Sequence, residues 1–436
     1  MRLSRASLAE VPHPVRTPAY DMGALKAGIV HLGLGAFHRA HQAVFTDDAI
    51  EAAGGDWGIV GVSMRRPDVA DTLTPQDGLY TVETLAAEPS YRVVGALRRA
   101  LTLPLQPQAV VSAIADPATR VITLTITEKG YCLAGDSLDL AHPDIVHDLG
   151  AEGAPRSAIG VLVAGLAERS RGAAGPLTII SCDNLADNGR RLETAVRDFA
   201  ARAHAALEPW LDSNTAFPET MVDCIVPATD GASRARVEAA IGMTDLASVQ
   251  REPFAQWVIE DRFAGPRPAW PGVEVVARVA DYRRLKLHVL NAAHSALAYL
   301  GLRRGHVFVR QAIADPQLAS SLDEMIFAEV APALAGLAVA DYWRATRDRF
   351  ANPMVDHRLD QIAQDGRQKL AERLYPLMRS NLQAGRPLAR MAEVVRAWLE
   401  AERPRQAAQS VGDPDLFPDT FRTDPRMSAA VSQARP

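Results

Sequence analysis

The chain has 436 residues, of which 48% are apolar and 23% are charged, as in globular proteins with more than one domain. No stretch reaches the roughly 18 uninterrupted apolar residues of a membrane-spanning helix, and the N-terminus lacks the apolar core of a secretory signal. A net charge of −5 disfavours nucleic acid as a partner, and three scattered cysteines fit reduced thiols. We therefore expect a cytoplasmic enzyme with no membrane and no nucleic-acid partner.

The first informative segment is a glycine turn that follows the short apolar run 28–32. Gly33-Leu34-Gly35 has the Gly-x-Gly pattern, and a helical stretch follows it. A strand, a glycine turn and a helix in this order form a dinucleotide-binding unit, in which Gly33 permits the turn and Gly35 lets a pyrophosphate approach the backbone. His38 occupies the place of the third glycine, so the pattern also fits an ordinary turn.

Further apolar segments predict the rest of a parallel sheet. Residues 57–62, 121–126 and 177–180 are nearly continuous apolar runs, and a helical pattern at 158–171 separates the last two. Such alternation is typical of a parallel sheet that helices cover on both faces. Ligands of these sheets bind at the carboxyl ends of the strands, where this sequence becomes polar. The polar residues there are Thr127, Glu128 and Lys129, and then Ser181, Cys182, Asp183 and Asn184.

The character of the chain changes after a proline-rich stretch at 266–271. Residues 281–401 show helical periodicity with few strand-like runs. We predict an α/β fold in which a Rossmann-type parallel-sheet domain, residues 1–275, is followed by a mainly α-helical substrate and catalytic domain, residues 276–436.

The candidate catalytic residues lie at the start of this helical region. The sequence has neither Cys-x2-Cys nor His-Glu-x2-His, so we predict no metal site, and a side chain must then remove the hydroxyl proton in an alcohol oxidation. On a helix, Asn291 and His294 are neighbours one turn apart, and Lys286 lies about 80° around from His294. Burial of this face would favour a neutral lysine that can act as a base. The same spacing also fits an exposed lysine beside two satisfied core residues.

A second pattern at this place is misleading. Tyr282 and Lys286 match the Tyr-x3-Lys pair of short-chain dehydrogenases, but those enzymes carry Gly-x3-Gly-x-Gly in the first turn and this chain does not.

Several longer runs identify a known family. From Val30 to about Trp398 the sequence resembles the mannitol dehydrogenase family of polyol-specific long-chain dehydrogenases. The matching runs are HLGLGAFHRAHQ (31–42), TITEKGYC (125–132), SCDN (181–184), FPETMVDCIVP (217–227), EPFAQWVIEDRF (252–263) and KLHVLNAAHSALAYLG (286–301).

The resemblance implies a role for each matched residue. Lys286 would be the general base, Asn291 and His294 would bind the reacting oxygen together with Asn184, and Asp223 would lie near the lysine and the substrate. The residues expected to bind the cofactor are Gly33, Leu34, Gly35, Ala36, Phe37, Arg65, Thr127 and Glu128.

The resemblance to this family favours NAD as the cofactor, although the local sequence leaves NADP open. A ribose-binding acid usually ends the second strand, about 20 residues beyond the glycines. Here the second strand is expected at 59–62, and Asp68 is the first acid after it. Arg65 or Arg66, which precede Asp68, could instead bind a 2′-phosphate or remain solvated. We predict NAD.

The run 352–369 bears on the substrate. Its NP…HR…QIA…DG-x-x-K pattern resembles fructuronate reductases, with Gln361 where mannitol enzymes tend to carry arginine. On one helix Arg358, Gln361 and Asp365 would share a face with Lys369 just beyond, and such a face could hold a carboxylate. An intrahelical ion pair with Asp365 fits the same spacing.

These patterns predict an oxidoreductase with a small-molecule substrate. We expect an NAD-dependent, metal-independent enzyme that interconverts a secondary alcohol and a ketone on a linear sugar acid or polyol. D-Mannonate and D-fructuronate are the first candidates, and D-mannitol with D-fructose or another polyol is the alternative. A non-catalytic NAD-binding sensor is the rival of a different class. The joint presence of Lys286, Asn291, His294 and Asn184 argues against it. The oligomeric state is not predicted.

Overall fold

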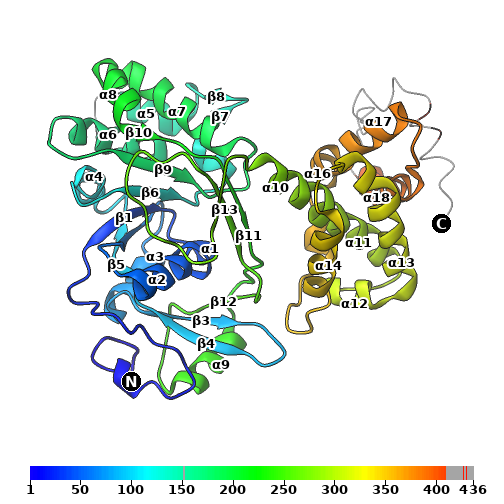
Figure 1. Ribbon diagram of the computed structural model, residues 1–436, viewed down its shortest axis with the longest axis horizontal. Helices are drawn as coiled ribbons and strands as arrows, with labels where there is room; N and C mark the ends of the chain where they lie inside the picture. The colour runs from blue at the N-terminus through cyan, green and yellow to red at the C-terminus, as the bar shows by residue number, and fades with distance from the viewer. Residues whose placement is uncertain (151–152, 409–425, 427–428, 430–436) are drawn as a thin grey trace. The chain divides into compact units, whose positions relative to one another are not determined.

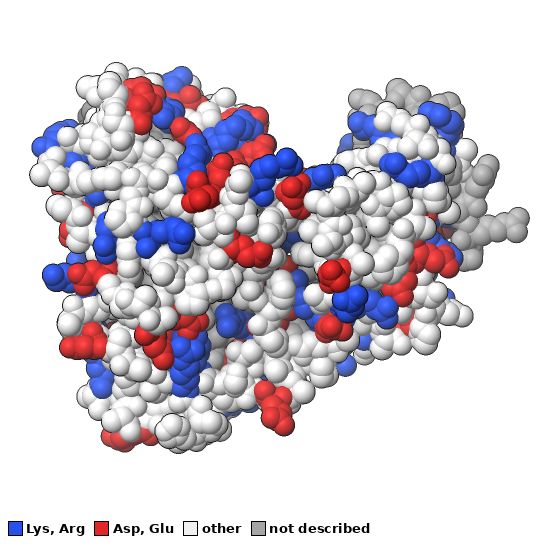
Figure 2. Space-filling view, in the orientation of Figure 1, with Lys and Arg blue, Asp and Glu red and all other residues white. Residues whose placement is uncertain are grey.

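The chain folds into two compact units. A computed structural model describes residues 1–150, 153–408, 426 and 429. The N-terminal unit is Met1–Val279 and the C-terminal unit is Ala280–Pro436, and Figure 1 shows strands in the first and helices in the second. No helix among the described residues is long and apolar enough to cross a membrane. Acidic and basic side chains are intermixed over the faces seen in Figure 2.

A six-stranded sheet organises the N-terminal unit. Its strand order is β10-β9-β6-β1-β2-β5, and every neighbouring pair is parallel. The chain runs outward from β1 through β2 to β5, then returns to the other side of β1 to add β6, β9 and β10. The strands are β1 (Ala27–Leu32), β2 (Gly58–Ser63), β5 (Leu97–Thr102), β6 (Val121–Leu124), β9 (Leu177–Ser181) and β10 (Thr215–Ala216). The direction of strand addition therefore reverses beside β1.

The central strands are mostly apolar because both faces of the sheet are covered. Along β1, Val30 and Leu32 belong to one apolar cluster and Ile29 to another, as the alternation of side chains requires. The first cluster includes α4 (Pro107–Ala115), α6 (Ala158–Ser170) and α7 (Asn188–Ala203). The second includes α2 (Gln42–Ala53) and α3 (Asp68–Leu73). The predicted combination of an α/β sheet domain and a helical domain is confirmed.

Besides a two-stranded sheet of β7 (Leu133–Ala134) and β8 (Ser137–Leu138), two three-stranded sheets were not predicted from the sequence. One has the order β12-β3-β4 and the other β11-β13-β14. Their strands are short and mix parallel with antiparallel pairing, so they give no long apolar run. Their bounds are β3 (Tyr80–Thr84), β4 (Ser90–Val94), β12 (Val249–Arg251), β11 (Thr220–Asp223), β13 (Gln256–Glu260) and β14 (Glu274–Val276).

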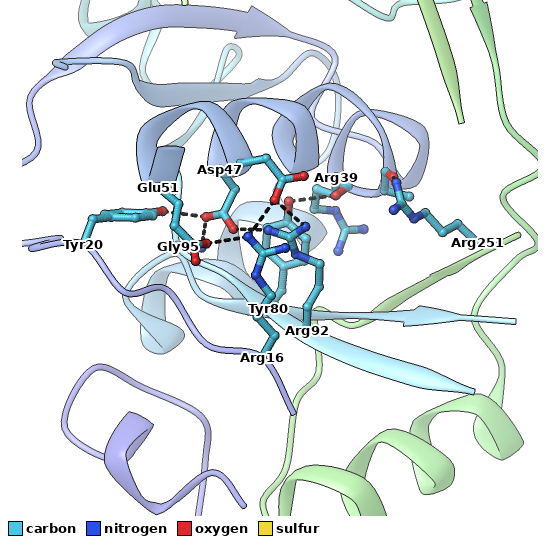
Figure 3. A network of polar contacts seen from close by, with 11 residues as sticks. Arg16, Tyr20, Arg39, Asp47, Glu51, Tyr80, Arg92, Gly95 and Arg251 are labelled. Atoms are coloured by element: carbon cyan, nitrogen blue, oxygen red, sulfur yellow. Dashed lines mark hydrogen bonds and ion pairs between the residues drawn. The ribbon is translucent and has the colours of Figure 1, made fainter. Parts of the chain in front are cut away.

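The buried carboxylate of Asp47, in α2, forms hydrogen bonds that connect this helix to neighbouring segments (Figure 3). The Asp47 carboxylate accepts hydrogen bonds from the Tyr20 hydroxyl at 2.5 Å, from Arg92 Nη2 at 2.6 Å and from the Gly95 N–H at 2.9 Å. Burial raises the pKa of Asp47, and Arg92 opposes that effect. Three donors thus compensate the desolvation of one carboxylate, and they come from the N-terminal segment, from β4 and from the residue after β4.

The C-terminal unit is a helical assembly around α11 (Ala292–Arg303). Every residue from Ala292 to Gly301 is buried, so α11 forms the centre of an apolar cluster. Gly366 marks a close approach, because an added Cβ would lie 2.1 Å from the Tyr299 hydroxyl. The other helices are α10 (Ala280–Leu285), α12 (Val309–Ala314), α13 (Pro316–Glu324), α14 (Val339–Phe350), α15 (Leu359–Ile362), α16 (Gly366–Arg373), α17 (Tyr375–Gln383) and α18 (Ala389–Ala408).

A stacked histidine pair gives the N-terminal unit a pH-dependent stability. The His31 and His38 rings are buried with centroids 3.4 Å apart, and neither ring nitrogen of His38 has a hydrogen-bond partner among the described residues. Burial lowers the pKa of His31 to about 3 and the pKa of His38 well below its ordinary value. The unfolded chain takes up these protons near pH 6.5, so this contribution is present above that pH and is lost as the pH falls below it.

We predict that His38→Phe weakens this acid sensitivity. Phenylalanine keeps the stacked ring and removes one titrating group. The pH dependence of the free energy of unfolding between pH 6.5 and 5 should therefore fall by up to about 1.4 kcal/mol per pH unit. Denaturant titrations at several pH values measure it, with His13→Phe at an exposed histidine as the control. The same pH dependence in His38→Phe and in the parent would contradict the prediction.

Candidate active site

A cavity of about 480 Å³ opens at the carboxyl ends of β1, β2 and β6, where the direction of strand addition reverses. This is the position at which open parallel sheets bind their ligands. Five of the eight predicted cofactor residues line it, namely Gly33, Leu34, Gly35, Arg65 and Thr127. Its remaining lining residues are Ser63, Met64, Thr125, Ile126, Lys129, Gly130, Cys132, Asp144, Arg156, Ser157 and Ala158.

A larger cavity of about 790 Å³ lies beside α3 and β5 and contains none of the predicted site residues. Because it is away from the strand ends that carry the glycine turn, we place the candidate cofactor site in the smaller cavity.

The two glycines of the turn serve different purposes. Gly33 has φ +102°, and an added Cβ would lie 2.1 Å from the Thr125 carbonyl oxygen, so the fold itself requires this glycine. Gly35 is different, because the nearest atom to an added Cβ is the Gly33 oxygen at 3.8 Å. The protein leaves the space in front of Gly35 open, which suits the close approach of a phosphate group. Ala36 and Phe37 begin α1 (Ala36–Ala40), where first-turn N–H groups have no intrahelical acceptor.

The loop after β6 is held in place by Asp183, which sequence reasoning listed without a role. Its carboxylate accepts hydrogen bonds from the N–H groups of Ile126 at 2.9 Å and Thr127 at 3.0 Å, and from the Tyr131 hydroxyl at 2.8 Å. Burial raises the pKa of Asp183, and these donors oppose that effect. The SCDN and TITEKGYC runs are therefore parts of one structural unit. Glu128 begins the short turn Glu128–Tyr131 and does not line the cavity.

The end of β2 carries no acidic residue. Ser63 ends the strand, Met64 and Arg65 line the cavity, and Asp68 is the first residue of α3. Arg66 is exposed and does not line the cavity. After β2, where an acidic residue usually binds the ribose of the cofactor, this cavity is therefore lined by a cation, Arg65.

Asn184 and Asp223 lie at the ends of two strands that belong to different sheets of the N-terminal unit. Asn184 lies three residues after β9 and is exposed, whereas Asp223 is the last residue of β11 and is buried. The Asn188 side chain joins the two segments. Its amide nitrogen donates to the Ser181 carbonyl at 3.3 Å and to the Thr220 hydroxyl at 3.0 Å.

In the C-terminal unit, the predicted catalytic helix is not regular. Lys286–Asn291 is π-helical, and α11 follows directly. In a regular α-helix, Lys286 and Asn291 would lie about 140° apart around the axis. A π-turn holds more residues in each turn, which brings these two side chains closer to one face, and such turns are frequent at functional sites. The expected α-helical geometry over this segment was therefore wrong.

His294 lies one turn further along, in a buried and cationic environment. Its ring centroid is 4.3 Å from that of Phe350 and 5.2 Å from that of His357, and its Nε2 atom has no hydrogen-bond partner among the described residues. Burial lowers the pKa of His294 well below its ordinary value, and the charges of His357, Arg349 and Arg373 act in the same direction. His294 is therefore neutral at neutral pH.

The residues predicted to hold a carboxylate do not share one helix. α15 ends at Ile362, and Asp365 has φ +55°, a left-handed conformation that separates α15 from α16. The expectation of one helical face was wrong for this reason. Arg358 is exposed, with Nη2 at 2.7 Å from the Asp360 carboxylate, and Gln361 is exposed as well.

Lys369 is in a different environment. Its Nζ atom donates to the Ile362 carbonyl at 3.2 Å, and burial lowers the pKa of Lys369, with the Arg373 charge adding to the effect. Lys369 also helps to lower the pKa of His357, after burial. Of the three predicted carboxylate-binding residues, Lys369 is therefore the one that the structure connects to the surroundings of His294.

Comparison with known proteins decides the family. Residues 27–272 match the model of the mannitol dehydrogenase Rossmann domain, and residues 278–431 match that of the mannitol dehydrogenase C-terminal domain. The chain belongs to the mannitol dehydrogenase family. It is therefore an oxidoreductase of the type that acts on CH–OH groups.

Three relatives illustrate the range of the mannitol dehydrogenase family. D-Mannonate oxidoreductase of Escherichia coli (strain K12) is 38% identical over 398 residues, which are 88% of this chain and 82% of the relative. The structure of Pseudomonas fluorescens mannitol 2-dehydrogenase with NAD and D-mannitol is 33% identical, with a TM-score of 0.86, and the match covers 100% of this chain and 96% of that one. A substrate-free D-sorbitol dehydrogenase structure is 31% identical, with a TM-score of 0.91 and coverages of 99% and 96%.

Sequence reasoning missed several residues that surround these sites. Ser157, which caps α6, and Arg156 line the cofactor cavity, but no strand end points to them in the sequence. His357 and Arg373 lie near His294, and both fall in or next to the run 352–369 that was singled out. Their spacing carried no helical pattern because the segment breaks at Asp365. Among the residues that the structure describes, no three His, Cys, Asp or Glu side chains gather as a metal site.

Proposed function

We propose that this member of the mannitol dehydrogenase family is an NAD-dependent, metal-independent enzyme that interconverts a secondary alcohol and a ketone on a linear sugar acid. D-Mannonate and D-fructuronate are the preferred pair. The observation that carries the proposal is the placement of Lys286 and Asn291 on one π-turn, directly before the buried and neutral His294.

The chemistry follows from the proton affinities of these groups. When bound, the nicotinamide ring accepts the hydride from the alcohol carbon. Lys286 takes the hydroxyl proton as the general base, while Asn291 and His294 donate hydrogen bonds to the oxygen as its charge develops. Because the pKa of His294 is depressed, its ring offers an N–H without competing for the proton. Asn184 is assigned to the same oxygen, and Asp223 to the substrate, by their positions in the family's motifs.

The cofactor assignment rests on the cavity at the strand ends. The open space in front of Gly35 fits a pyrophosphate, and the first-turn N–H groups of Ala36 and Phe37 are suitable donors to it. Thr127 and Glu128 are assigned to the same cofactor. The P. fluorescens relative binds NAD, which favours NAD here. Arg65 is the feature that favours a 2′-phosphate instead.

The preference for a sugar acid rests on the charges around His294. Arg349, Lys369 and Arg373 all lie in the C-terminal unit, and each lowers the pKa of His294 or of its neighbour His357. A carboxylate gains charge-assisted hydrogen bonds from such groups, which a neutral hexitol cannot match. We assign Lys369 as the main partner, with Arg358 and Gln361 as outer contacts. D-Mannitol with D-fructose is the second candidate, supported by the D-mannitol complex of the relative.

We predict that Lys286→Met removes turnover and spares cofactor binding. The loss of a general base lowers kcat by about 10² to 10⁴, because no other group of the cluster can exchange a proton near neutral pH. Oxidation and reduction are followed by absorbance at 340 nm, and the Kd for NADH by fluorescence. Arg284→Met, at an exposed residue nearby, is the control. A Lys286→Met enzyme within threefold of the parent kcat would refute the assignment. A parent that binds NADH but turns over no polyol or sugar acid would support the sensor.

We predict that the parent prefers NADH and that Arg65→Asp strengthens this preference. A carboxylate at this position accepts a hydrogen bond from a ribose hydroxyl and repels a 2′-phosphate, so the ratio of the NADPH Kd to the NADH Kd should rise about tenfold or more. Fluorescence titrations with both dinucleotides measure it. Arg66→Asp, outside the cavity lining, should change the ratio less. A parent with a tenfold preference for NADPH would reverse the NAD assignment.

We predict a higher kcat/KM for D-fructuronate than for D-fructose. Lys369→Met should remove most of this difference, because it lowers kcat/KM for the acid and affects the neutral ketose less. Arg358→Met should have the smaller effect, since that guanidinium is exposed and paired with Asp360. Steady-state kinetics with the acids, the hexitols and their keto partners provides the comparison. If D-fructose or D-mannitol has the higher kcat/KM, the sugar-acid assignment fails and the family membership stands.

A further inference from the structure

Arg373, the last residue of α16, contacts the catalytic π-turn from two sides. Its guanidinium Nη1 donates to the Asn291 carbonyl at 3.2 Å and to the Ser295 hydroxyl at 3.0 Å. Its own carbonyl accepts a hydrogen bond from His288 Nδ1 at 2.9 Å. The Arg373 side chain is partly buried, and its acceptors among the described residues are a carbonyl and a hydroxyl. One residue thus holds both the middle and the end of the segment Lys286–Asn291.

These contacts lie where the helix changes its winding. Asn291 is the last π-helical residue, and Ser295 lies four residues further along in α11, so the guanidinium spans the junction. A π-turn is an uncommon local conformation that persists where its surroundings stabilise it. Both hydrogen bonds come from one nitrogen, Nη1, and the shorter side chain of a lysine would not place its ammonium at the same point.

The position of Asn291 depends on this junction. Its side chain is assigned to the reacting oxygen, and its carbonyl is the acceptor for Arg373. Rewinding of the segment to a regular α-helix would move Asn291 away from the face of Lys286, toward the separation of about 140°. A displacement of about 1 Å from the productive geometry can lower the rate by about 10².

We propose that Arg373 is a positioning residue that maintains the π-turn, so that Lys286 and Asn291 act on the same substrate oxygen. The inference rests on the proposed function. Arg373 is not a catalytic residue in this scheme, because it acts through the backbone of Asn291 and the hydroxyl of Ser295.

The test compares Arg373→Ala and Arg373→Lys with Arg379→Ala, which removes an exposed arginine of the adjacent helix α17. We expect Arg373→Ala to lower kcat about 10²-fold while the NADH Kd stays within twofold of the parent. The kcat of Arg373→Lys should lie between those of Arg373→Ala and the parent, and the kcat of Arg379→Ala should match that of the parent. Added guanidinium chloride, at concentrations that leave the parent folded and active, should restore part of the kcat of Arg373→Ala and none of Lys286→Met.

Hydrogen exchange measured by mass spectrometry reads the π-turn itself. Peptides that cover residues 286–295 should exchange faster in both Arg373 variants, and peptides of the N-terminal unit should not change. This readout does not require turnover, so it separates the inference from the proposed function. If the parent shows no turnover but Arg373→Lys loosens 286–295, the function fails and the positioning role stands.

Two results would overturn the inference. One is a kcat within threefold of the parent in Arg373→Ala, together with unchanged exchange over 286–295. The other is a lower Tm with faster exchange throughout the C-terminal unit and no response to guanidinium, which would make Arg373 a general stabilising residue. If Arg373→Ala does not fold, the kcat and the exchange of Arg373→Lys decide the question.

Discussion

The parallel pairing of β1 with β2 on one side and with β6 on the other is the constraint on which the N-terminal unit depends. Because these strands are parallel, their carboxyl ends all lie at one edge of the sheet, and crossover connections join them. Because the order of strands reverses beside β1, the loops after these strands diverge and leave a cavity between them. At this edge the backbone after β1 lies close to the backbone after β6. Residue 33 must therefore be glycine, because the Thr125 carbonyl occupies the space that a side chain at residue 33 would need.

Polar residues at this edge differ in what they do for the loops. Asp183 and Asn184 are adjacent in the SCDN run but differ in this respect. The Asp183 carboxylate accepts three hydrogen bonds from the segment 126–131 and so fixes its path, including the positive φ of Thr127. Asn184 is exposed beyond the strand. A short motif can therefore join a residue that supports the fold to one that the family's pattern assigns to the proposed chemistry.

The sequence allowed the large elements of the fold to be predicted for a clear physical reason. Strands buried on both faces are mostly apolar, so β1, β2, β6 and β9 appear as nearly continuous apolar runs. The short strands of the two three-stranded sheets have no such requirement and were missed. The helical region was recognised by its periodicity, but two local departures from the α-helix could not be. The left-handed Asp365 and the π-turn Lys286–Asn291 are local departures that the spacing of side chains along one regular helix does not reveal.

These departures change how the chemistry is understood. A regular helix would put Lys286 and Asn291 on different faces, so Asn291 could not act on the same substrate oxygen as Lys286. The π-turn reduces that separation. The lowered pKa of His294 then separates the proposed role of this histidine, as a hydrogen-bond donor, from that of Lys286, as a proton acceptor. A neutral imidazole can donate to an oxygen that gains negative charge, but at neutral pH it is a poor acceptor for the proton that leaves. In the proposed mechanism, the proton therefore goes to Lys286. Burial keeps His294 neutral, and the arginines that add to this effect are cations that would also attract a carboxylate, so one arrangement of charge would serve both the protonation state of His294 and the selection of an acidic substrate.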